Sequence, residues 1–265
     1  VSGNSSAAEL LRTNLFSTVP MLEFCRRHSA VFTLLSTSRV YGINPLLEIP
    51  LSVENDAFSP KNNSPFLSGI SESFPSTAPI SLYGASKLCA ETLALEYGEA
   101  FGFPVWINRC GVLAGPGQFG KADQGIFSFW IHRWAAKQPL KYLGFGGHGF
   151  QVRDCLHPRD LIPLLLQQSD AGAAKDKARL LNISGGIQSA TSLKQLSNWC
   201  MTRLGTHTVK CDGQERPYDL PWVVLDSALA KQEWKWHPNT SAESIFEEIA
   251  EHALANPHWL DLCSR

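Results

Sequence analysis

The chain has 265 residues, of which 44% are hydrophobic and 18% charged, and its net charge at pH 7 is −1. This length and composition are those of an ordinary globular protein with one large or two unequal domains around a substantial core. A net charge near zero creates no overall field that would attract a nucleic acid or a membrane surface. We therefore expect neither of these as a partner.

The seven cysteines are scattered and include no C-x-x-C pair, which predicts neither a disulfide framework nor a zinc site. No stretch approaches the roughly eighteen consecutive apolar residues of a membrane span, and no basic and then apolar signal opens the chain. We expect no bound metal and a cytoplasmic location, where thiols stay reduced.

Strand-like and helix-like segments alternate along the first half of the chain. Helical spacing of apolar residues predicts a helix over residues 10–25, and a short buried strand follows over 31–36. Residues 43–80 are rich in Pro, Ser and Asn, and we expect a loop there. Helical spacing returns over 83–101, and the next buried strand is expected over 105–113.

The second half adds more helices, two short strands about a glycine turn, and one further strand. The helices are expected at 126–137, 158–168, 191–204 and 241–255, the two strands within 140–157 and the last strand at 178–184. Hydroxyl side chains at the helix starts, Thr191 or Ser192 and Ser241 or Ser244, are typical N-caps. The alternation favours an α/β fold with a parallel sheet, and the Gly- and Pro-rich second half suggests a smaller α+β lobe.

The stretch GFGGHG at residues 144–149 has the G-x-G-x-x-G spacing of a dinucleotide-binding turn. In such a turn a helix follows, and its N-terminus faces the pyrophosphate. Here the chain continues as FQVRDCLH, which alternates like a strand. We therefore interpret residues 144–149 as a hairpin turn and not as a cofactor site.

Tyr83 and Lys87 of the stretch YGASK lie four residues apart at the start of a predicted helix, so their side chains share one face. A tyrosine hydroxyl is a poor base at neutral pH because its pKa is about 10. A neighbouring ammonium stabilises the phenolate, which would make Tyr83 a general base for a hydroxyl proton. The same spacing also fits a plain surface pair.

The stretch LLSTSRVYG places small hydroxyl residues just after the buried strand at 31–36, at the carboxyl end where open α/β sheets bind ligands. Together with YGASK it resembles the extended short-chain dehydrogenases/reductases, the nucleotide-sugar epimerases and dehydratases. The resemblance implies that Thr37 binds the reacting hydroxyl, Tyr83 is the base and Lys87 is its partner. It implies NAD as the cofactor, bound by Asn14, Tyr83, Lys87, Cys110 and Gly111.

The same resemblance implies a nucleotide-diphosphate sugar as the substrate. Its expected ligands are Thr37, Ser38, Gln118, Asp123, Gln124, Arg153, Arg216 and Asp219. An arginine fork suits a diphosphate because it is planar and permanently charged. Taken alone, Arg153 fits a structural salt bridge as well, and Asp123 fits a helix cap.

The resemblance also predicts how the chain divides. Residues 1–115 would be the C-terminal part of a Rossmann domain, to which about 150–185 return, and 116–265 would be mainly a substrate-binding lobe. Family members begin with a strand, a glycine-rich turn and a helix that hold the pyrophosphate of NAD, and this chain starts after them. We expect a fragment with a partial Rossmann-type parallel sheet that holds only the nicotinamide end.

Within the family, STSRVYG, NRCGVLAGP and GFGGHGFQVRD are most similar to the CDP-paratose 2-epimerase group. The 4,6-dehydratases carry an Asp-Glu pair directly after the catalytic Thr, whereas this chain has Ser38 and Arg39. The resemblance thus implies C2 epimerisation of a CDP-linked deoxyhexose through a transient ketone, in a possible homodimer paired through the helix after Tyr83. The alternatives are a binding protein without turnover, a dehydratase, and an oxidoreductase that releases NADH.

Overall fold

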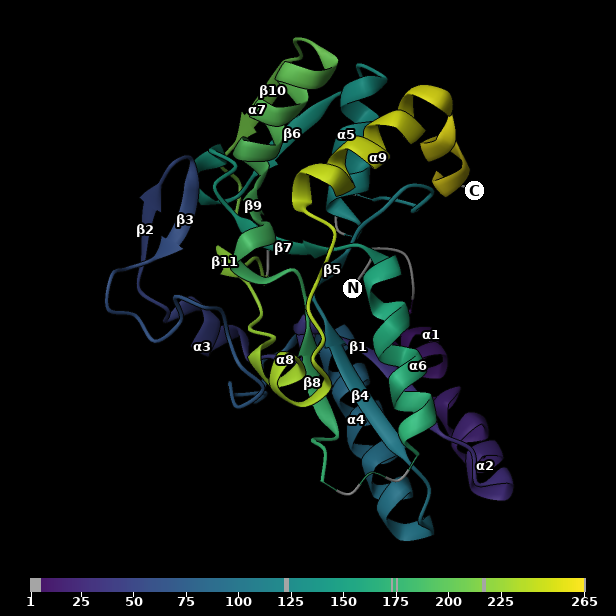
Figure 1. The fold of residues 1–265 in the computed structure, drawn as a ribbon. Coiled ribbons are helices and arrows are strands. Elements are labelled where there is room, and N and C mark those ends of the chain that lie inside the picture. The colour runs from purple at the N-terminus through teal and green to yellow at the C-terminus, as the bar shows by residue number, and fades with distance from the viewer. Residues whose placement is uncertain (1–5, 122–123, 173, 175, 216–217, 265) are drawn as a thin grey trace.

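Three parallel strands form the sheet in the lower half of the molecule (Figure 1). The computed structural model describes residues 6–121, 124–172, 174, 176–215 and 218–264. The strands lie in the order β1 (Phe32–Thr37), β4 (Val105–Cys110) and β8 (Leu180–Ile183), with Thr37 opposite Cys110. All three strands therefore end at the same edge, which is the edge where open α/β sheets bind ligands.

Strand β4 is buried on both faces, and its side chains alternate between two layers of helices. Val105 and Ile107 pack with one layer, while Trp106 packs with the other. The helices of the first layer are α2 (Thr18–His28) and α4 (Ser81–Phe101), and those of the second are α6 (Ile162–Ala171) and α8 (Ala228–Trp234). An apolar run such as VWI at residues 105–107 is typical of a strand that is covered on both sides.

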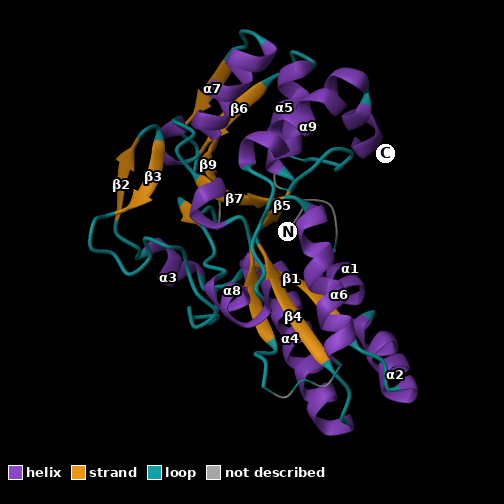
Figure 2. Ribbon diagram, in the orientation of Figure 1, coloured by secondary structure: helices purple, strands orange, loops and turns teal. Residues whose placement is uncertain are grey.

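A second, mainly helical lobe lies above the sheet (Figure 2). Its core packs three helices against one strand of a parallel pair. These elements are α5 (Ile126–Ala135), α7 (Leu193–Leu204), α9 (Ala242–Ala255), β6 (Leu140–Leu143) and β10 (Val209–Asp212). Two predicted caps are confirmed, because Ser192 and Ser241 accept the backbone N–H groups of Gln195 and Ser244 at 3.0 and 3.1 Å.

A small sheet lies between the sheet of β1, β4 and β8 and the upper lobe. Its strands are β5 (Val112–Leu113), β7 (Val152–Leu156), β9 (Ala190–Ser192) and β11 (Trp222–Val223), with β7 between β5 and β11. The N-terminal region adds α1 (Ala7–Leu11), a π-helical turn (Arg12–Phe16), α3 (Ile43–Leu47), β2 (Leu51–Glu54) and β3 (Ala57–Pro60). The predicted α/β class with a parallel sheet is thus confirmed.

Three local predictions are wrong. Residues 43–80 are not all loop, because α3 and the β2–β3 hairpin lie within them, and the hairpin turns at Asn55 and Asp56, which both have positive φ. The strand expected over 105–113 breaks at Gly111, where the chain passes from the sheet of β4 to the sheet of β5. A side chain at Gly111 would collide with the Ser184 hydroxyl, so the crossing requires glycine.

The segment 144–149 is not a hairpin turn. Strand β6 pairs with β10, whereas β7 pairs with β5, β9 and β11, so the segment joins two different sheets. Its glycines serve close packing, since a Cβ at Gly147 would lie 2.8 Å from the Asp212 nitrogen and one at Gly149 would overlap the Tyr142 ring. The element that follows is a strand, as the sequence pattern predicts.

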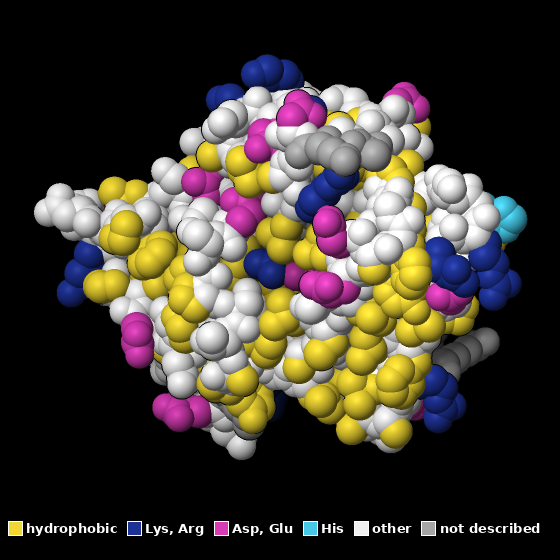
Figure 3. Space-filling view, turned by 90° about the horizontal axis from the view of Figure 1, so that it is seen from below, with side chains coloured by type: hydrophobic (Ala, Val, Ile, Leu, Met, Phe, Trp, Pro, Cys, Tyr) yellow, Lys and Arg dark blue, Asp and Glu magenta, His cyan; other side chains and the backbone are white. Residues whose placement is uncertain are grey.

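The outer edge of β1 has no strand partner among the described residues. Large apolar side chains are exposed on β1 and on the helical layer that packs on it, namely Leu35 on β1, Phe101 on α4, Met21 and Phe24 on α2, and Phe16 just before α2. Apolar side chains gather over much of the face that is seen from below (Figure 3). Within the described ranges, no helix combines the length and the hydropathy that crossing a bilayer requires.

Candidate active site

Thr37 and Tyr83 meet at the carboxyl end of β1. Thr37 is the last residue of the strand, and its Oγ1 accepts the Arg39 backbone N–H at 3.2 Å as a short 3-10 helix (Ser38–Val40) begins. Tyr83 lies in the first turn of α4, and its phenol is close enough to the Thr37 side chain for that hydroxyl to lower the pKa of Tyr83. The two oxygens therefore share one side of the sheet edge.

Gly84 explains how closely these segments approach. A Cβ at this helical position would overlap the Arg39 carbonyl oxygen and lie 3.1 Å from the carbonyl carbon. The absent side chain lets the 3-10 helix Ser38–Val40 rest directly on α4, one residue after Tyr83. Gly84 is buried and its φ is not positive, so it is required by packing and not by backbone conformation.

The electrostatics at Tyr83 differ from the sequence prediction. Burial raises the pKa of the phenol above 10, and the Thr37 hydrogen bond and the Arg39 charge oppose this rise. Lys87 is not among the groups that change the Tyr83 pKa. The expectation that the ammonium of Lys87 makes the phenol acidic is therefore wrong for this structure, where the nearby cation is the guanidinium of Arg39.

Lys87 instead binds the backbone of β1. Its Nζ donates to the Leu35 carbonyl oxygen at 2.8 Å. Burial lowers the pKa of Lys87, and the negative charge of Glu91, one turn further along α4, opposes this. An ammonium has three N–H donors, so two remain for a ligand at the carboxyl end of β1.

The other residues predicted to bind the cofactor lie close to the site with different degrees of access. Asn14 donates from Nδ2 to Ser86 Oγ at 3.1 Å and so lies against α4, three residues after Tyr83. Cys110 is buried, and its thiol lies 3.5 Å from the Asn108 carbonyl oxygen. The Gly111 N–H donates to the Ile183 carbonyl. The Cys110 side chain is thus closed to a ligand, and the Gly111 N–H is already in use.

Two residues predicted to bind the substrate, Ser38 and Arg153, line one small pocket. Ser38, Arg39, Ser81, Arg153 and Tyr218 are among its lining residues. Thr37 and Tyr83 do not themselves line this pocket, but Ser38 directly follows Thr37 and Ser81 lies two residues before Tyr83. The structure therefore brings Ser38 and Arg153, 115 positions apart in the sequence, to the same place.

Arg153 is held by two backbone carbonyl groups and by a nearby carboxylate. Its guanidinium donates to the carbonyl oxygens of Val152 and Leu220 at 2.7 and 2.9 Å, and it lies 4.0 Å from the Asp219 carboxylate. Asp219 also accepts the Leu220 backbone N–H at 3.0 Å. Arg153 and Asp219, both predicted to bind substrate, are thus brought together across the chain.

Two further residues predicted to bind the substrate do not line this pocket. Gln118 donates from Nε2 to the Leu113 carbonyl at 2.8 Å and so holds its own loop, while Gln124 is exposed and bonds through its backbone to Lys121. Asp123 and Arg216 lie outside the described residues. Within the same described ranges, no group of three or more His, Cys, Asp or Glu side chains is placed to hold a metal ion.

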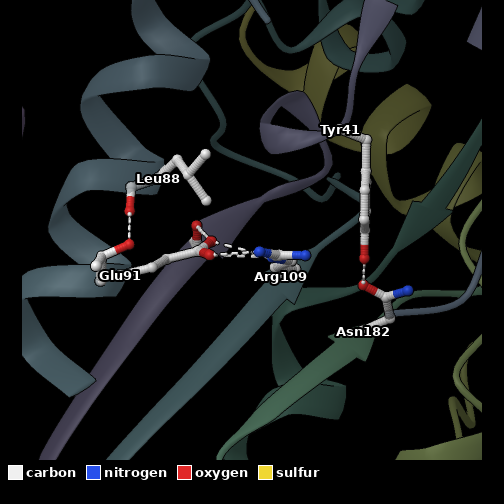
Figure 4. A network of polar contacts seen from close by, with 7 residues as sticks. Tyr41, Leu88, Glu91, Arg109 and Asn182 are labelled. Atoms are coloured by element: carbon white, nitrogen blue, oxygen red, sulfur yellow. Dashed lines mark hydrogen bonds and ion pairs between the residues drawn. The ribbon is translucent and has the colours of Figure 1, made fainter. Parts of the chain in front are cut away.

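Sequence reasoning missed a buried polar network next to the site (Figure 4). Glu91 of α4 receives hydrogen bonds from Arg109 of β4, and the Arg109 guanidinium lies 4.9 Å from the centre of the Tyr41 ring. The Tyr41 hydroxyl donates to Asn182 Oδ1 of β8 at 2.6 Å. A signal was present, because Arg109 is the single charge in an otherwise uncharged strand and Glu91 follows Lys87 by four residues.

The family model of the NAD dependent epimerase/dehydratase family matches residues 2–184. The chain belongs to this family. A UDP-glucose 4-epimerase of Corynebacterium glutamicum is 27% identical over 230 residues, which are 82% of this chain and 65% of that protein. A CDP-paratose 2-epimerase of Salmonella typhi is 30% identical over 178 residues, 63% of this chain and 50% of that protein.

The structures of this family share the fold. A dTDP-glucose 4,6-dehydratase of Bacillus anthracis in complex with NAD superposes with a TM-score of 0.71 at 21% identity, covering 98% of this chain and 73% of that one. The chain spans between half and two thirds of the length of the two epimerases above. Both of these relatives are therefore longer than this epimerase/dehydratase chain.

Proposed function

We propose that this chain carries the catalytic groups of an NAD-dependent nucleotide-sugar epimerase. The observation that carries the proposal is the pairing of the Thr37 hydroxyl with the Tyr83 phenol at the carboxyl end of the sheet. A sugar hydroxyl placed between them can donate its proton toward Tyr83 while it accepts a hydrogen bond from Thr37. General acid and base catalysis requires this kind of hydrogen-bond contact.

The residues of this site fit the nicotinamide end of NAD. The Lys87 ammonium lies at the carboxyl end of β1 with two N–H donors beyond the one that Leu35 uses, which suits ribose hydroxyls. Asn14 is hydrogen-bonded to Ser86, which directly precedes Lys87 on α4, and Tyr83 lies one turn before Lys87 on the same helix. When bound there, NAD supplies the hydride acceptor and donor that a reversible oxidation of a sugar carbon needs.

Arg153 and Asp219 would receive the diphosphate and the ribose of the substrate. The Arg153 guanidinium already borders the pocket that Ser38 and Ser81 line, and its charge suits a diphosphate. Asp219 and the carbonyl groups of Val152 and Leu220 hold the guanidinium in place. A fixed guanidinium loses less freedom when it binds an anion, so the binding energy is larger.

Ser38 and Arg39 favour epimerisation over dehydration. The dehydratases that this chain resembles carry an Asp-Glu pair at these two positions, and loss of water needs such additional acid and base groups. Epimerisation needs only reversible oxidation at one carbon, through a ketone that is reduced from its other face. Thr37, Tyr83 and Lys87 are enough for that share of the chemistry.

We further propose that the substrate is a CDP-linked deoxyhexose and that the epimerised carbon is C2. This finer assignment is supported by the similarity to a CDP-paratose 2-epimerase, which is 30% identical over 178 residues. The same site residues would serve other nucleotide sugars. The relative at 27% identity, for example, is named as an epimerase of UDP-glucose and not of a CDP-linked sugar.

The test uses the complete natural protein, purified and assayed for bound NAD and for exchange between the C2 epimers of a CDP-hexose. Tyr83→Phe should lower kcat by about 10² to 10⁴, the usual contribution of a general acid or base, while bound NAD is retained. Tyr97→Phe, on the same helix α4 but near its other end, is the matched control and should keep wild-type turnover.

Four outcomes would redirect the assignment. Full turnover of Tyr83→Phe would remove Tyr83 from its role as base. Release of NADH in proportion to product would identify an oxidoreductase, and loss of water would identify a dehydratase. Binding of the sugar nucleotide without any turnover by the wild-type protein would leave a binding function only.

A further inference from the structure

Tyr83, Lys87 and Glu91 follow one another at four-residue intervals and form one stripe along α4. The first two belong to the proposed catalytic site, whereas Glu91 lies one turn deeper in the protein. Its exposure is 1%, and that of its partner Arg109 is 5%. Two charges this deeply buried require an explanation, because their removal from water costs several kcal/mol per ion.

The Glu91 carboxylate connects α4 to two neighbouring strands. Arg109 of β4 donates to it from Nε at 3.1 Å and from Nη2 at 2.7 Å, and the Ser36 hydroxyl of β1 donates to its other side. Ser36 and Arg109 are direct partners in the parallel pairing of β1 with β4. One carboxylate therefore fixes the helix to both strands at the same height of the sheet.

The network continues to the third strand. Arg109 is the pairing partner of Asn182 on β8, and Asn182 accepts the Tyr41 hydroxyl at 2.6 Å while the Arg109 guanidinium lies against the Tyr41 ring (Figure 4). Ser36, Arg109 and Asn182 thus form one row across β1, β4 and β8. This row lies one residue before the strands end at Thr37, Cys110 and Ile183.

We propose that Glu91 is a positioning residue that sets Thr37 against Tyr83. The inference rests on the proposed function of these two residues. The α4 stripe holds three consecutive residues of β1: Lys87 binds the Leu35 carbonyl, Glu91 binds the Ser36 hydroxyl, and Tyr83 pairs with Thr37. Since Ser36 directly precedes Thr37, the Ser36–Glu91 contact fixes the backbone of β1 next to the residue that carries the catalytic hydroxyl.

Stability alone does not account for this pair. Buried ion pairs can often be replaced by apolar residues of similar volume without loss of stability, so stability does not by itself explain why this pair is present. The Glu91 charge has a second effect on the site, because it raises the pKa of Lys87 against the effect of burial. Glu91 thus acts on the proposed site through Ser36 and through Lys87, without touching a substrate itself.

The experiment compares two variants with one control, all in the complete natural protein. Ser36→Ala removes one hydrogen bond and leaves the ion pair, and Glu91→Gln removes the charge and keeps the shape. The control is Gln168→Met, which breaks the reciprocal amide pair of Asn108 and Gln168 at 2.8 and 3.0 Å. Asn108 is the residue before Arg109 on β4, but it faces α6 on the opposite layer.

Ser36→Ala and Glu91→Gln should lower kcat roughly 10- to 100-fold with KM unchanged, because a misplacement of about 1 Å can reduce the rate about 10²-fold. The second readout needs no turnover. The Tyr83 phenol is titrated by ultraviolet difference spectroscopy, with Tyr83→Phe in each background as the reference. Both variants should raise the Tyr83 pKa, since the Thr37 hydrogen bond that lowers it is displaced.

Gln168→Met should lose stability but keep the wild-type kcat and the wild-type Tyr83 titration. The proposal is overturned if Ser36→Ala and Glu91→Gln titrate like the wild type, or if Gln168→Met changes kcat and the Tyr83 titration as strongly as they do. A wild-type protein that turns over no nucleotide sugar would refute the proposed function instead, and the titration would still decide the role of Glu91.

Discussion

Asp154 of β7 is a carboxyl group that is buried in the protein, where its charged form is disfavoured. It is 2% exposed, its Oδ2 accepts the Leu225 backbone N–H at 2.8 Å and the Ser184 hydroxyl, and the Gly111 backbone covers its other oxygen. Burial raises the pKa of Asp154 from 3.8 to about 6, more than the hydrogen bonds from Ser184 and Leu225 lower it. Its charge is therefore unfavourable in the folded protein.

The sign of the pH dependence follows from this raised pKa. Below pH 3.8 the group is protonated in both states, so it has no effect on the free energy of unfolding. As the pH rises, the unfolded chain ionises first and stability falls, until the folded group also ionises above about pH 6. The full loss is about 3 kcal/mol, and about 2 kcal/mol of it falls between pH 4.5 and 7.5.

Asp154→Asn keeps the shape of the side chain and stays neutral at every pH. Urea unfolding of wild type and variant at pH 4.5 and 7.5 should show the variant gaining about 2 kcal/mol relative to wild type at the higher pH. Asp212→Asn is the control and should show no such change between pH 4.5 and 7.5, because the Gln214 backbone N–H and Lys141 lower the Asp212 pKa below 3.8 and its effect on stability falls at lower pH. A difference between Asp154→Asn and wild type that does not change with pH would refute the reasoning.

Two further predictions concern the contact between the 3-10 helix Ser38–Val40 and α4. Arg39→Met should raise the Tyr83 pKa in the ultraviolet titration, because the Arg39 charge lowers it, and Lys87→Met should change it less; a larger effect of Lys87→Met would restore the ammonium to this role. Gly84→Ala, which gains about 1 kcal/mol in an exposed helix, should instead lose about 1 to 3 kcal/mol in urea unfolding, because the new methyl group overlaps the Arg39 carbonyl. A stabilised Gly84→Ala variant would show that this contact is loose.

Local patterns were sufficient for the elements that are long or buried on both faces. The apolar runs that became β1, β4 and β8, and the helical spacing that became α4 and α9, are periodic over enough residues to be read directly. The cap of α7 was also readable, because Ser192 and Gln195 have the spacing of a capping box and form both of its hydrogen bonds.

Two of the three errors occur where the pairing partners are distant in the sequence, whereas the missed β2–β3 hairpin pairs within residues 51–60. The segment 140–157 looks like a hairpin because two apolar runs flank glycines, yet β6 pairs with β10, about 70 residues later. The break at Gly111 depends on Ser184 and Asp154, which are also remote in the chain. No local window contains this information, so the division of the strands among sheets could not be read from the sequence.

The candidate site divides in a similar way. The resemblance to a family of known chemistry led to Thr37, Tyr83 and Arg153, because those residues lie in recognisable stretches. Glu91 and Arg109 escaped notice because an isolated glutamate on a helix usually faces water, and only the tertiary structure buries it against its partner. Their role depends on three-dimensional pairing, which is why it enters as a proposal from the structure.

The Arg39 position links the electrostatics of the site to the choice of reaction. In the dehydratases that the chain resembles, this position carries a glutamate, whose negative charge would raise the pKa of a neighbouring phenol and disfavour the phenolate. The Arg39 guanidinium does the opposite at Tyr83, and it supplies no carboxyl group that could protonate a leaving hydroxyl. Arg39 at this position therefore favours the phenolate form of Tyr83 and supplies no acid for the elimination of water, and both effects support the proposed epimerisation.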